Sequence, residues 1–548
     1  MLVERLPDPG DVAVTEDAEA ALEETLLDAV SLDVLRCEKA DESLGRRDSR
    51  HGITLSKKVR SPRGGHGPHP RELHRRRLVA STGESARAVV SPVTGETLAE
   101  APDASVDDVD RAVAAARAAQ PKWAALTAWE RAKICHVIAD LIVERREAFA
   151  RELSLEQGKP YEAEALGDID ETAENFRIAA EDVKRMETAI IPSQDPNKRI
   201  LTFRKPNGVY AAITPWNFPT LIPVELIAPG IAVGNTIVMK PSEWTPIAMA
   251  NFMQIMADAG LPDGVVNVVY GGGDVGERLV THPGVDCVGF VGSHPTAEKI
   301  VRAAGLKRSL IEASGNGPVI VCEDADLERA AQGAVFGGFF CAGQVCCATE
   351  RVLVHERVHD SFLDEVMKAA SDWRLGDPFD DTTRVGPMNN EPTAAKMDRH
   401  LEDALDKGAS VVLGGSRAGD RPTSLYYEPT VVTDVGVDTL INQQETFGPI
   451  VPLIRVRSDD EALAVANDSH LGLQAAVYTS NLKRAFRFVD SLRVGNVVVN
   501  DSTDYWEAHE PFGGASGTQS GWGRIGGRYT MLDMSDLKTV VLDVGGLD

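Results

Sequence analysis

The sequence predicts an α/β protein built from two lobes, each containing a parallel β-sheet covered by helices. Short runs of apolar and β-branched residues alternate with helical stretches over most of the chain. These runs are apolar throughout, which is typical of strands buried on both faces of a parallel sheet. The alternation occurs in two successive series, and this indicates two sheets with a cleft between them.

The composition excludes several classes of protein. The 548 residues include 57 Lys or Arg and 83 Asp or Glu, giving a formal charge of −26. This acidity argues against nucleic acid as the main partner. No apolar run reaches the length of about 18 residues that predicts a membrane span. The chain does not begin with a basic segment followed by an apolar one, so secretion is not expected.

The seven cysteines include no C-x-x-C pair, so neither a disulfide framework nor a thiolate zinc site is expected. We therefore expect a cytoplasmic protein without a bound metal.

The first 85 residues form a separate extension. Residues 16–34 are acidic and rich in Ala and Leu, as in an amphipathic helix, and residues 57–77 are basic and rich in Gly and Pro. The basic run is interpreted as a flexible arm, although it could contact nucleic acid, an acidic surface or the acidic segment before it.

Two series of elements follow this extension. The first series opens with a turn at residues 91–96, and its helices are expected over residues 106–119, 128–155 and 163–187. Its strands are expected at residues 208–213, 236–240, 265–270 and 287–291. The second series has strands at residues 318–322, 352–354, 451–454 and 496–499.

One glycine-rich turn follows a strand of the first series. Gly271-Gly-Gly-Asp-Val-Gly276 fits the pattern G-x-G-x-x-G and precedes a helical stretch. In this context backbone N–H groups can receive a pyrophosphate. Glycine turns after strands are also common without any ligand. The acidic residue about 20 positions further on, Glu298, does not decide between the two interpretations.

Cys346 is the best candidate for a reactive cysteine. It lies in Phe339-Phe-Cys-Ala-Gly-Gln-Val-Cys346, a turn of small residues before a strand, which permits close approach of a substrate and of backbone N–H donors. Cys346 and Cys347 are adjacent, so at most one of them can point into a given cavity. Four other cysteines, Cys37, Cys135, Cys287 and Cys322, lie in or beside apolar patterns and are interpreted as packing residues.

A series of motifs resembles the NAD(P)-dependent aldehyde dehydrogenase superfamily, in the family's own order. The motifs are Thr214-Pro-Trp-Asn-Phe-Pro219, Lys240-Pro-Ser-Glu243, Phe290-Val-Gly-Ser293, Glu312, Gly343-Gln-Val-Cys346, Glu445-Thr-Phe-Gly-Pro449 and Pro511-Phe-Gly-Gly514. The resemblance extends from about residue 90 to the C-terminus. It implies the aldehyde dehydrogenase fold, with two Rossmann-like lobes and a β element for oligomerisation.

The resemblance also implies the catalytic residues. Cys346 resembles the nucleophile, whose thiolate attacks the aldehyde carbon and forms a thiohemiacetal. Asn217 resembles the side-chain donor of the oxyanion hole, with the backbone N–H of Cys346 as a second donor. Glu312 resembles the general base that activates water to hydrolyse the thioester left after hydride transfer.

The cofactor contacts follow from the same resemblance. Lys240 and Glu243 resemble ligands of the adenosine ribose, and a carboxylate at Glu243 would repel a 2′-phosphate, which favours NAD over NADP. Gly292 and Ser293 resemble the turn that receives the pyrophosphate. The turn at residues 271–276 is therefore expected only to support the site and not to bind the pyrophosphate itself. The full set of expected contacts is Thr214, Pro215, Trp216, Lys240, Ser242, Glu243, Gly276, Gly292, Ser293, Glu445 and Phe447.

The residues beside the motifs should line the aldehyde tunnel. They are Phe218, Leu221, Val345, Cys347 and Trp506, and they favour an aliphatic or aromatic aldehyde. No arginine flanks Cys346 to bind the carboxylate of a semialdehyde. Glu225 could favour a polar or cationic group, or could lie on a helix surface. A reversible Cys346–Cys347 disulfide is a hypothesis for regulation, with a packed thiol as its alternative.

The predicted domains are an N-terminal extension at 1–85, an NAD-binding domain at 86–183 and 207–314, a catalytic domain at 315–528, and a bridging element at 184–206 and 529–548. The apolar tail strand at 537–544 would be an exposed edge in a monomer, so we expect a homodimer or homotetramer.

The predicted function is NAD-dependent oxidation of a small aldehyde to its carboxylic acid. The alternatives are an enzyme that transfers the acyl group to coenzyme A, or an idle scaffold that binds a partner through its N-terminal arm.

Overall fold

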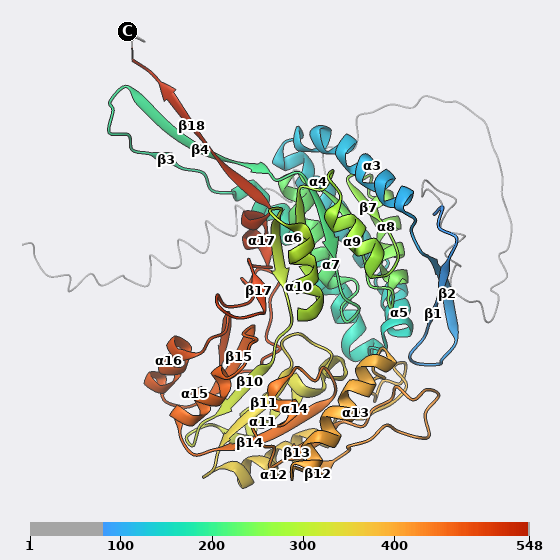
Figure 1. Ribbon diagram of the computed structural model, residues 1–548, viewed down its shortest axis with the longest axis vertical. Helices are drawn as coiled ribbons and strands as arrows, with labels where there is room; N and C mark the ends of the chain where they lie inside the picture. The colour runs from blue at the N-terminus through green and yellow to red at the C-terminus, as the bar shows by residue number, and fades with distance from the viewer. Residues whose placement is uncertain (1–80, 546–548) are drawn as a thin grey trace, which may run out of the picture. The chain divides into compact units, whose positions relative to one another are not determined.

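The structure is a computed structural model that describes residues 81–545. The acidic and basic segments predicted between residues 16 and 77 lie outside the described residues. The described chain contains two large, mostly parallel sheets, a three-stranded antiparallel sheet and a two-stranded hairpin (Figure 1). The predicted α/β fold class is confirmed. No helix within residues 81–545 has both the length and the hydropathy to cross a membrane.

The first large sheet has six strands in the order β17-β9-β8-β5-β6-β7. The strands are β5 (Val209–Ile213), β6 (Thr236–Lys240), β7 (Val266–Val268), β8 (Cys287–Val291), β9 (Arg308–Glu312) and β17 (Gly521–Trp522). All neighbouring pairs are parallel except β17 with β9. Every residue of β5, β6 and β8 is buried, which explains why these strands are apolar throughout.

Helices cover both faces of this sheet. Side chains alternate between the two faces along each strand, so successive residues of one strand pack against different helices. In β5, Tyr210 and Ala212 join one hydrophobic cluster, whereas Ala211 and Ile213 join another. The first cluster includes residues of α4 (Ala128–Glu144), α5 (Arg146–Gln157), α6 (Leu166–Asp182), α7 (Leu221–Val233) and α8 (Pro246–Asp258). The second includes residues of α3 (Val106–Ala124), α9 (Gly273–Thr281) and α10 (His294–Ala304).

The second large sheet has seven strands in the order β12-β13-β14-β11-β10-β15-β16. The strands are β10 (Gly317–Val321), β11 (Thr349–His355), β12 (Ser410–Leu413), β13 (Thr430–Thr433), β14 (Ile450–Val456), β15 (Gln474–Tyr478) and β16 (Asn496–Val499). Only the β12–β13 pair in this sheet is antiparallel. The accompanying helices are α11 (Leu327–Phe339), α12 (His359–Ala370), α13 (Glu391–Asp406), α14 (Leu440–Gln443), α15 (Asp459–Asn467) and α16 (Leu482–Ser491).

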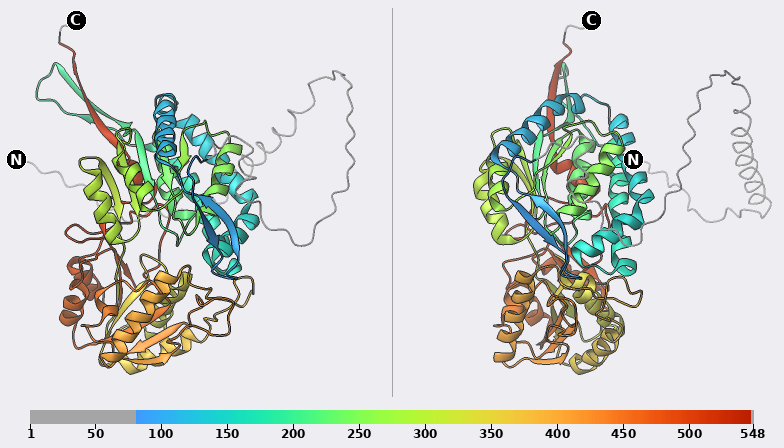
Figure 2. Two further views of the ribbon diagram at one scale, coloured as in Figure 1. Left: turned by 45° about the vertical axis from the view of Figure 1, so that its right-hand side comes forward. Right: turned by 90° about the vertical axis from the view of Figure 1, so that its right-hand side faces the viewer.

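The two smaller sheets involve segments at the ends of the described chain. β1 (Ala86–Val90) and β2 (Thr97–Pro102) form a hairpin around the predicted turn. β18 (Ser535–Asp543) pairs with β4 (Lys198–Pro206) over nine residues of each strand, and β4 also pairs with the short β3 (Ile190–Ile191). Figures 1 and 2 show β4 and β18 running side by side away from the neighbouring helices. The short helix α17 (Gly527–Asp533) precedes β18.

Several predicted elements have different limits in the structure. The helix expected over 128–155 is broken at Arg145, whose N–H donates to the carbonyls of Leu141 and Ile142 and so closes α4. The helix expected over 163–187 comprises a π-helical turn at Tyr161–Ala165, α6 and a 3₁₀ turn at Val183–Arg185. The strand expected over 265–270 is limited to the three residues of β7.

Candidate active site

A left-handed backbone turn presents Cys346 between the two large sheets. After α11, a 3₁₀ turn spans Phe340–Gly343, and Cys341, Ala342 and Gly343 have φ angles of 52°, 53° and 69°. Such angles are costly for residues with a side chain, so the surrounding structure must hold them in place. A Cβ atom at Gly343 would lie 2.0 Å from the carbonyl oxygen of Gly448. Glycine is therefore required at this position.

Gln344 joins this turn to the neighbouring elements. Its backbone N–H and its side-chain amide both donate to the carbonyl of Cys341, at 3.1 and 2.9 Å. Its Oε1 accepts a hydrogen bond from the N–H of Asn389 at 2.8 Å, and its carbonyl accepts one from Nδ2 of Asn217 at 2.9 Å. All these groups are buried. The position of Asn217 is thus coupled directly to the segment that carries Cys346.

Cys346, Glu312 and Asn217 line one cavity of about 150 Å³. Glu312 is the last residue of β9, and Asn217 lies in the loop that follows β5, so both come from the carboxyl ends of parallel strands. Ligands of open α/β sheets bind at this edge. The complete lining is Pro215, Trp216, Asn217, Ile222, Val291, Gly292, Ser293, Glu312, Ser314, Cys346, Thr393, Lys396, Glu445 and Phe447.

The carboxyl group of Glu312 is in an environment that favours its protonated form. Burial and the nearby charge of Glu445 raise the pKa of Glu312 to about 8, against a smaller lowering by the hydrogen bond from the N–H of Ser314. That N–H lies 2.9 Å from Oε1. A carboxyl group with a pKa in this range can both accept and release a proton near neutral pH.

The thiol of Cys346 is also kept in its neutral form. A hydrogen bond with Cys347, burial, and the charges of Glu312 and Glu225 raise the pKa of Cys346 well above its usual value. The thiol of Cys347 in turn donates to Oδ1 of Asp504 at 3.4 Å. A nucleophilic reaction at Cys346 therefore needs a group that accepts its proton, and Glu312 lines the same cavity. The hypothesis of a Cys346–Cys347 disulfide stays a prediction.

Six of the expected cofactor contacts line the same cavity: Pro215, Trp216, Gly292, Ser293, Glu445 and Phe447. The rings of Trp216 and Phe447 pack edge to face, with centroids 5.5 Å apart. Gly292 has a φ of 156° and directly precedes Ser293, the N-cap residue of α10. The first N–H groups of a helix have no intrahelical acceptor and can receive a phosphate.

The other five expected cofactor contacts gather around Lys240 instead, outside the lining of this cavity. Nζ of Lys240 lies 3.7 Å from a carboxylate oxygen of Glu243 and donates to the carbonyl of Pro241 at 3.1 Å. The side chain of Lys240 also passes Gly276, where an added Cβ would be 3.5 Å from its Cδ. Thr214 donates its N–H to the carbonyl of Lys240, and Ser242 follows in the same loop.

Glu350 holds part of the cavity wall, although the sequence did not identify it. This buried residue of β11 accepts hydrogen bonds from the N–H groups of Thr446 and Phe447, at 2.7 and 2.9 Å. Phe447 has a φ of 62°, which few residues with a side chain adopt, and the two bonds stabilise it there. Other lining residues missed by the sequence analysis are Ile222, Val291, Ser314, Thr393 and Lys396.

The expected tunnel residues fall into two groups. Val345 and Cys347 belong to a small hydrophobic cluster, against which Cys346, Phe218 and Trp506 pack as partly buried neighbours. Among the described residues, this cluster does not include Leu221, the first residue of α7. Glu225 is buried, so its alternative interpretation as a helix-surface residue is wrong.

The fold and this cavity together define an α/β enzyme in which a cysteine, a glutamate and an asparagine face a space between two sheets. Comparison with known proteins gives the family: the sequence model of the aldehyde dehydrogenase family matches residues 78–540. The chain belongs to this family. It is thus an NAD(P)-dependent oxidoreductase that oxidises an aldehyde to its acid.

Individual relatives cover almost the whole of this match. Succinate-semialdehyde dehydrogenase [NADP(+)] of Escherichia coli is 38% identical over 84% of this chain and 95% of its own. Betaine aldehyde dehydrogenase of Bacillus subtilis is 38% identical over the same shares. The crystal structure of succinate-semialdehyde dehydrogenase from Burkholderia pseudomallei superimposes with a TM-score of 0.83, at 37% identity over 85% of this chain and 96% of that one.

Replacing Gly343 by alanine is expected to destabilise the protein more than a comparable change at Gly260. Both glycines have positive φ, so both substitutions share a backbone cost of about 1–2 kcal/mol. At Gly260 an added Cβ meets nothing within 4 Å, whereas at Gly343 it meets the carbonyl of Gly448. We expect this overlap to cost a further ~1–3 kcal/mol. Urea unfolding of both variants measures the difference, and equal losses would contradict it.

Proposed function

We propose that Cys346 is the nucleophile of the reaction. The thiol first gives up its proton, which Glu312 accepts and passes to solvent. Sγ then adds to the aldehyde carbon, and the carbonyl oxygen takes the negative charge in the resulting thiohemiacetal. The observation that supports this assignment most is the cavity that Cys346 shares with Glu312 and Asn217. Cys287, by contrast, lies within β8 in a fully buried position of the first sheet.

Asn217 and the backbone N–H of Cys346 stabilise the developing oxyanion. Nδ2 of Asn217 uses one N–H for the carbonyl of Gln344 and carries a second. Its Oδ1 is buried and has no hydrogen-bond partner among the described residues. The bond to Gln344 fixes the side chain before substrate arrives, and preorganised donors of this kind contribute about 100- to 1000-fold each to the rate.

The cavity residues fit a nicotinamide dinucleotide. NAD(P)⁺, when bound, supplies the acceptor for the hydride that leaves the thiohemiacetal carbon. Gly292 allows close approach at the start of α10, where backbone N–H groups suit the pyrophosphate, and Lys240 with Glu243 suits the adenosine ribose. Glu445 and Phe447, which line the cavity, would hold the nicotinamide ribose and ring.

Glu312 then activates water to release the acid. Loss of hydride leaves an acyl group on Sγ of Cys346 as a thioester. Glu312 removes a proton from water, the hydroxide adds to the thioester carbon, and the thiolate leaves with the bonding electrons. This role argues for hydrolysis over transfer of the acyl group to coenzyme A, and the complete set of three groups argues against an idle scaffold.

The domain division expected from the sequence is part of the proposal. The NAD-binding domain carries the parallel strands of the first large sheet, and the catalytic domain carries the second sheet together with β17, the antiparallel edge strand of the first. The bridging element comprises β3, β4 and β18. Because the proposed nucleophile must remain a free thiol, we place the protein in the reducing cytoplasm.

Replacing Cys346 by serine should abolish formation of NADH, whereas Cys347→Ser should retain it. Glu312→Gln should slow the loss of the thiol proton and also block hydrolysis, so that NADH formation is limited to one per active site at most, because a thioester that forms is not hydrolysed. Rapid mixing followed by mass spectrometry would detect the acyl adduct. Continued turnover of Cys346→Ser would refute the assignment of the nucleophile.

The pH dependence of hydrolysis provides a second readout on Glu312. The base acts in its deprotonated form, and the pKa of Glu312 is raised to about 8. Deacylation should therefore accelerate as the pH rises through about 8, and this dependence should be lost in Glu312→Gln.

We expect a preference for NAD⁺ over NADP⁺ that depends on Glu243. The carboxylate of Glu243 lies beside Nζ of Lys240, where it would repel a 2′-phosphate. Glu243→Gln should raise kcat/KM for NADP⁺ about tenfold, the equivalent of about 1.4 kcal/mol. Initial rates with both cofactors measure this, and Glu298→Gln on the exposed side of α10 provides a control. A parent enzyme that prefers NADP⁺ would show the proposal to be wrong.

We further propose that the protein is a homodimer or homotetramer. The sheet of β18, β4 and β3 exposes apolar side chains, namely Ile190, Ile191, Leu537, Val541 and Leu542. A small sheet of this kind is marginal unless another surface covers it. The edge strand β16 and the neighbouring helix α16 offer such a surface on a second copy, because α16 exposes Leu482, Phe486 and Val489.

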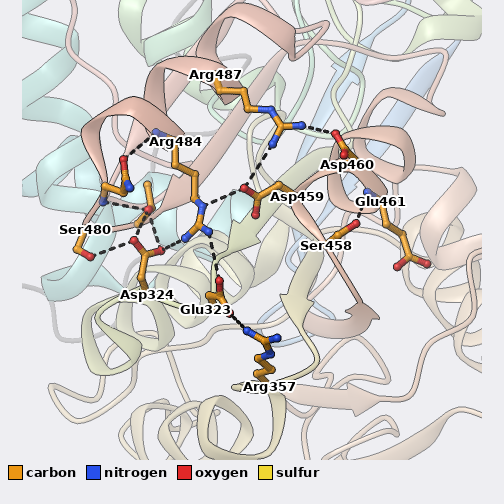
Figure 3. A network of polar contacts seen from close by, with 12 residues as sticks. Glu323, Asp324, Arg357, Ser458, Asp459, Asp460, Glu461, Ser480, Arg484 and Arg487 are labelled. Atoms are coloured by element: carbon orange, nitrogen blue, oxygen red, sulfur yellow. Dashed lines mark hydrogen bonds and ion pairs between the residues drawn. The ribbon is translucent and has the colours of Figure 1, made fainter.

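A network of charged groups holds α16 in this orientation (Figure 3). Arg484 bonds to Asp459, Asp324 and Glu323, at 2.9, 2.6 and 3.3 Å, and Arg487 pairs with Asp459 and Asp460. The charged side chains therefore fix the helix against the loop before α11 and the first turn of α15. Leu482, Phe486 and Val489 remain exposed on the outer side.

Removing β18 should dissociate the assembly. Light scattering of the full chain should give a multiple of the 59.0 kDa monomer, and a chain ending after Met534 should give a monomer or aggregate. Val541→Lys combined with Leu542→Lys should have the same effect while the strand remains. A full chain of 59.0 kDa in solution would contradict the proposal.

A further inference from the structure

A line of acidic side chains leads from an open hollow toward Cys346. The hollow has a volume of about 470 Å³ and is lined by Asp182, Tyr505, Glu507, His509, Glu510, Pro511, Arg528 and Tyr529. Part of its wall is the loop of residues 501–511. The same loop carries Asp504, whose carboxylate accepts a hydrogen bond from Cys347, the neighbour of the proposed nucleophile. The loop thus connects the hollow with the interior around Cys346.

Helix α6 provides the middle of this line. Asp168, Glu171 and Asp182 are separated by 3 and 11 residues, so they lie on one side of the helix over a length of about 21 Å. Asp182 lines the hollow, and Asp168 is buried next to Lys159. The charges of Asp168 and Glu507 both act on Glu171, which places it between the inner and the outer acids.

Glu225 lies at the inner end. This residue of α7 is 8% exposed, and among residues 81–545 it has neither a hydrogen bond nor an ion pair. Burial and the nearby charges of Glu312 and Asp168 raise the pKa of Glu225 well above its usual value, so that a cationic partner is needed to keep it ionised, and its charge in turn acts on Cys346. Burying a carboxyl group without a partner is costly, so a partner supplied by a ligand would stabilise it.

Two further carboxyl oxygens in this region have no partner. Oε2 of Glu164 and Oδ2 of Asp504 are buried and make no hydrogen bond among the described residues. The second oxygen of Glu164 accepts the N–H of Cys341 at 3.0 Å, and the charge of Glu164 acts on Asp504. Unused acceptors therefore surround the segment that carries Cys346.

The cations of this region are already paired. Nζ of Lys159 lies 2.6 Å from Asp168 and 3.2 Å from the ring centre of Phe218. At the hollow, His509 pairs with Glu507 at 3.2 Å, and Arg528 acts on Asp182. The charge of Lys159 acts on Glu164, whereas neither Glu225 nor Asp504 is influenced by one of these cations.

We propose that the substrate is an aldehyde that carries a positively charged ammonium group, and that Glu225 is the residue that selects it. This inference rests on the proposed function of Cys346. The acids of α6 and of the hollow attract the cation, and Glu225 binds it beside the nucleophile. The rings of Phe218 and Trp506, which pack around Cys346, add cation–π attraction. An aldehyde with a carboxylate would bring a like charge toward Glu225.

Three aldehydes of different charge test the proposal. They are 4-(trimethylammonio)butanal, its neutral isostere 5,5-dimethylhexanal, and the anion 4-oxobutanoate, each assayed for NADH formation by the full chain. We expect kcat/KM to be highest for the cation, about tenfold or more above the isostere, and lowest for the anion. A rate that is equal or higher for the isostere or the anion would overturn the proposal.

Variants assign the selectivity to particular residues. Glu225→Gln keeps the shape and removes the charge, and it should lower the ratio of cation to isostere about tenfold. Glu507→Gln, at an exposed position of the hollow, should lower it about threefold and keeps the test available if Glu225→Gln does not fold. Glu365→Gln on α12 removes an equal charge and should leave the ratio unchanged. An unaltered ratio in both Glu225→Gln and Glu507→Gln would overturn the assignment.

A binding measurement separates this inference from the proposed function. Choline and its neutral isostere 3,3-dimethylbutan-1-ol are compared as protectants of Cys346 against alkylation by iodoacetamide, followed by mass spectrometry. Stronger protection by choline supports recognition of a cation, and equal protection contradicts it. Absence of NADH with all three aldehydes would refute the proposed function alone, because the protection assay requires no turnover.

Discussion

The hydrogen bonds around Gln344 are the constraint on which the site depends. Three successive residues with positive φ precede Gln344, and a peptide segment alone would not keep this conformation. Gln344 closes the turn through the carbonyl of Cys341 and ties it to Asn217 and Asn389. Glu164 closes it from the other side through the N–H of Cys341. The same bonds therefore determine the path of the chain and the relative positions of Cys346 and Asn217.

The sequence predicted the parts of the fold that depend on burial. Strands β6, β8 and β16 have the limits expected from their apolar runs. β13 and β15 were not expected, since Gln474-Ala-Ala-Val-Tyr478 is short and only weakly apolar and its burial follows from its neighbours β10 and β16. The break at Arg145 was missed because apolar periodicity continues across it. A local pattern of apolar residues cannot show that α4 and α5, on either side of this break, pack differently.

In the site, motifs predicted the residues proposed to react and six of the expected cofactor contacts, but not the rest of the cavity wall. Cys346, Glu312 and Asn217 belong to recognisable motifs and meet in one cavity. Lys396 lies in an ordinary helix and Glu350 in an ordinary strand, and only the folded chain brings Lys396 into the cavity lining and Glu350 to Phe447, which lines it. The acids at Glu164, Asp168 and Glu225 come from separate elements, so their proximity has no signature in the sequence. Charge complementarity with a ligand emerges only in three dimensions.

The pairing of β17 with β9 has a consequence for how the chain is made. Gly521 lies opposite Glu312, and α17 packs against α6 and α7. The edge of the first sheet is therefore completed by residues synthesised after the whole of the second sheet. During synthesis on the ribosome, the first half of the chain therefore exposes an unpaired strand edge and an uncovered helix surface until the C-terminal residues have been made. A truncation near the C-terminus would thus damage the first lobe as much as the second. A chaperone that binds the nascent chain would act on the surfaces of the first lobe that are still exposed.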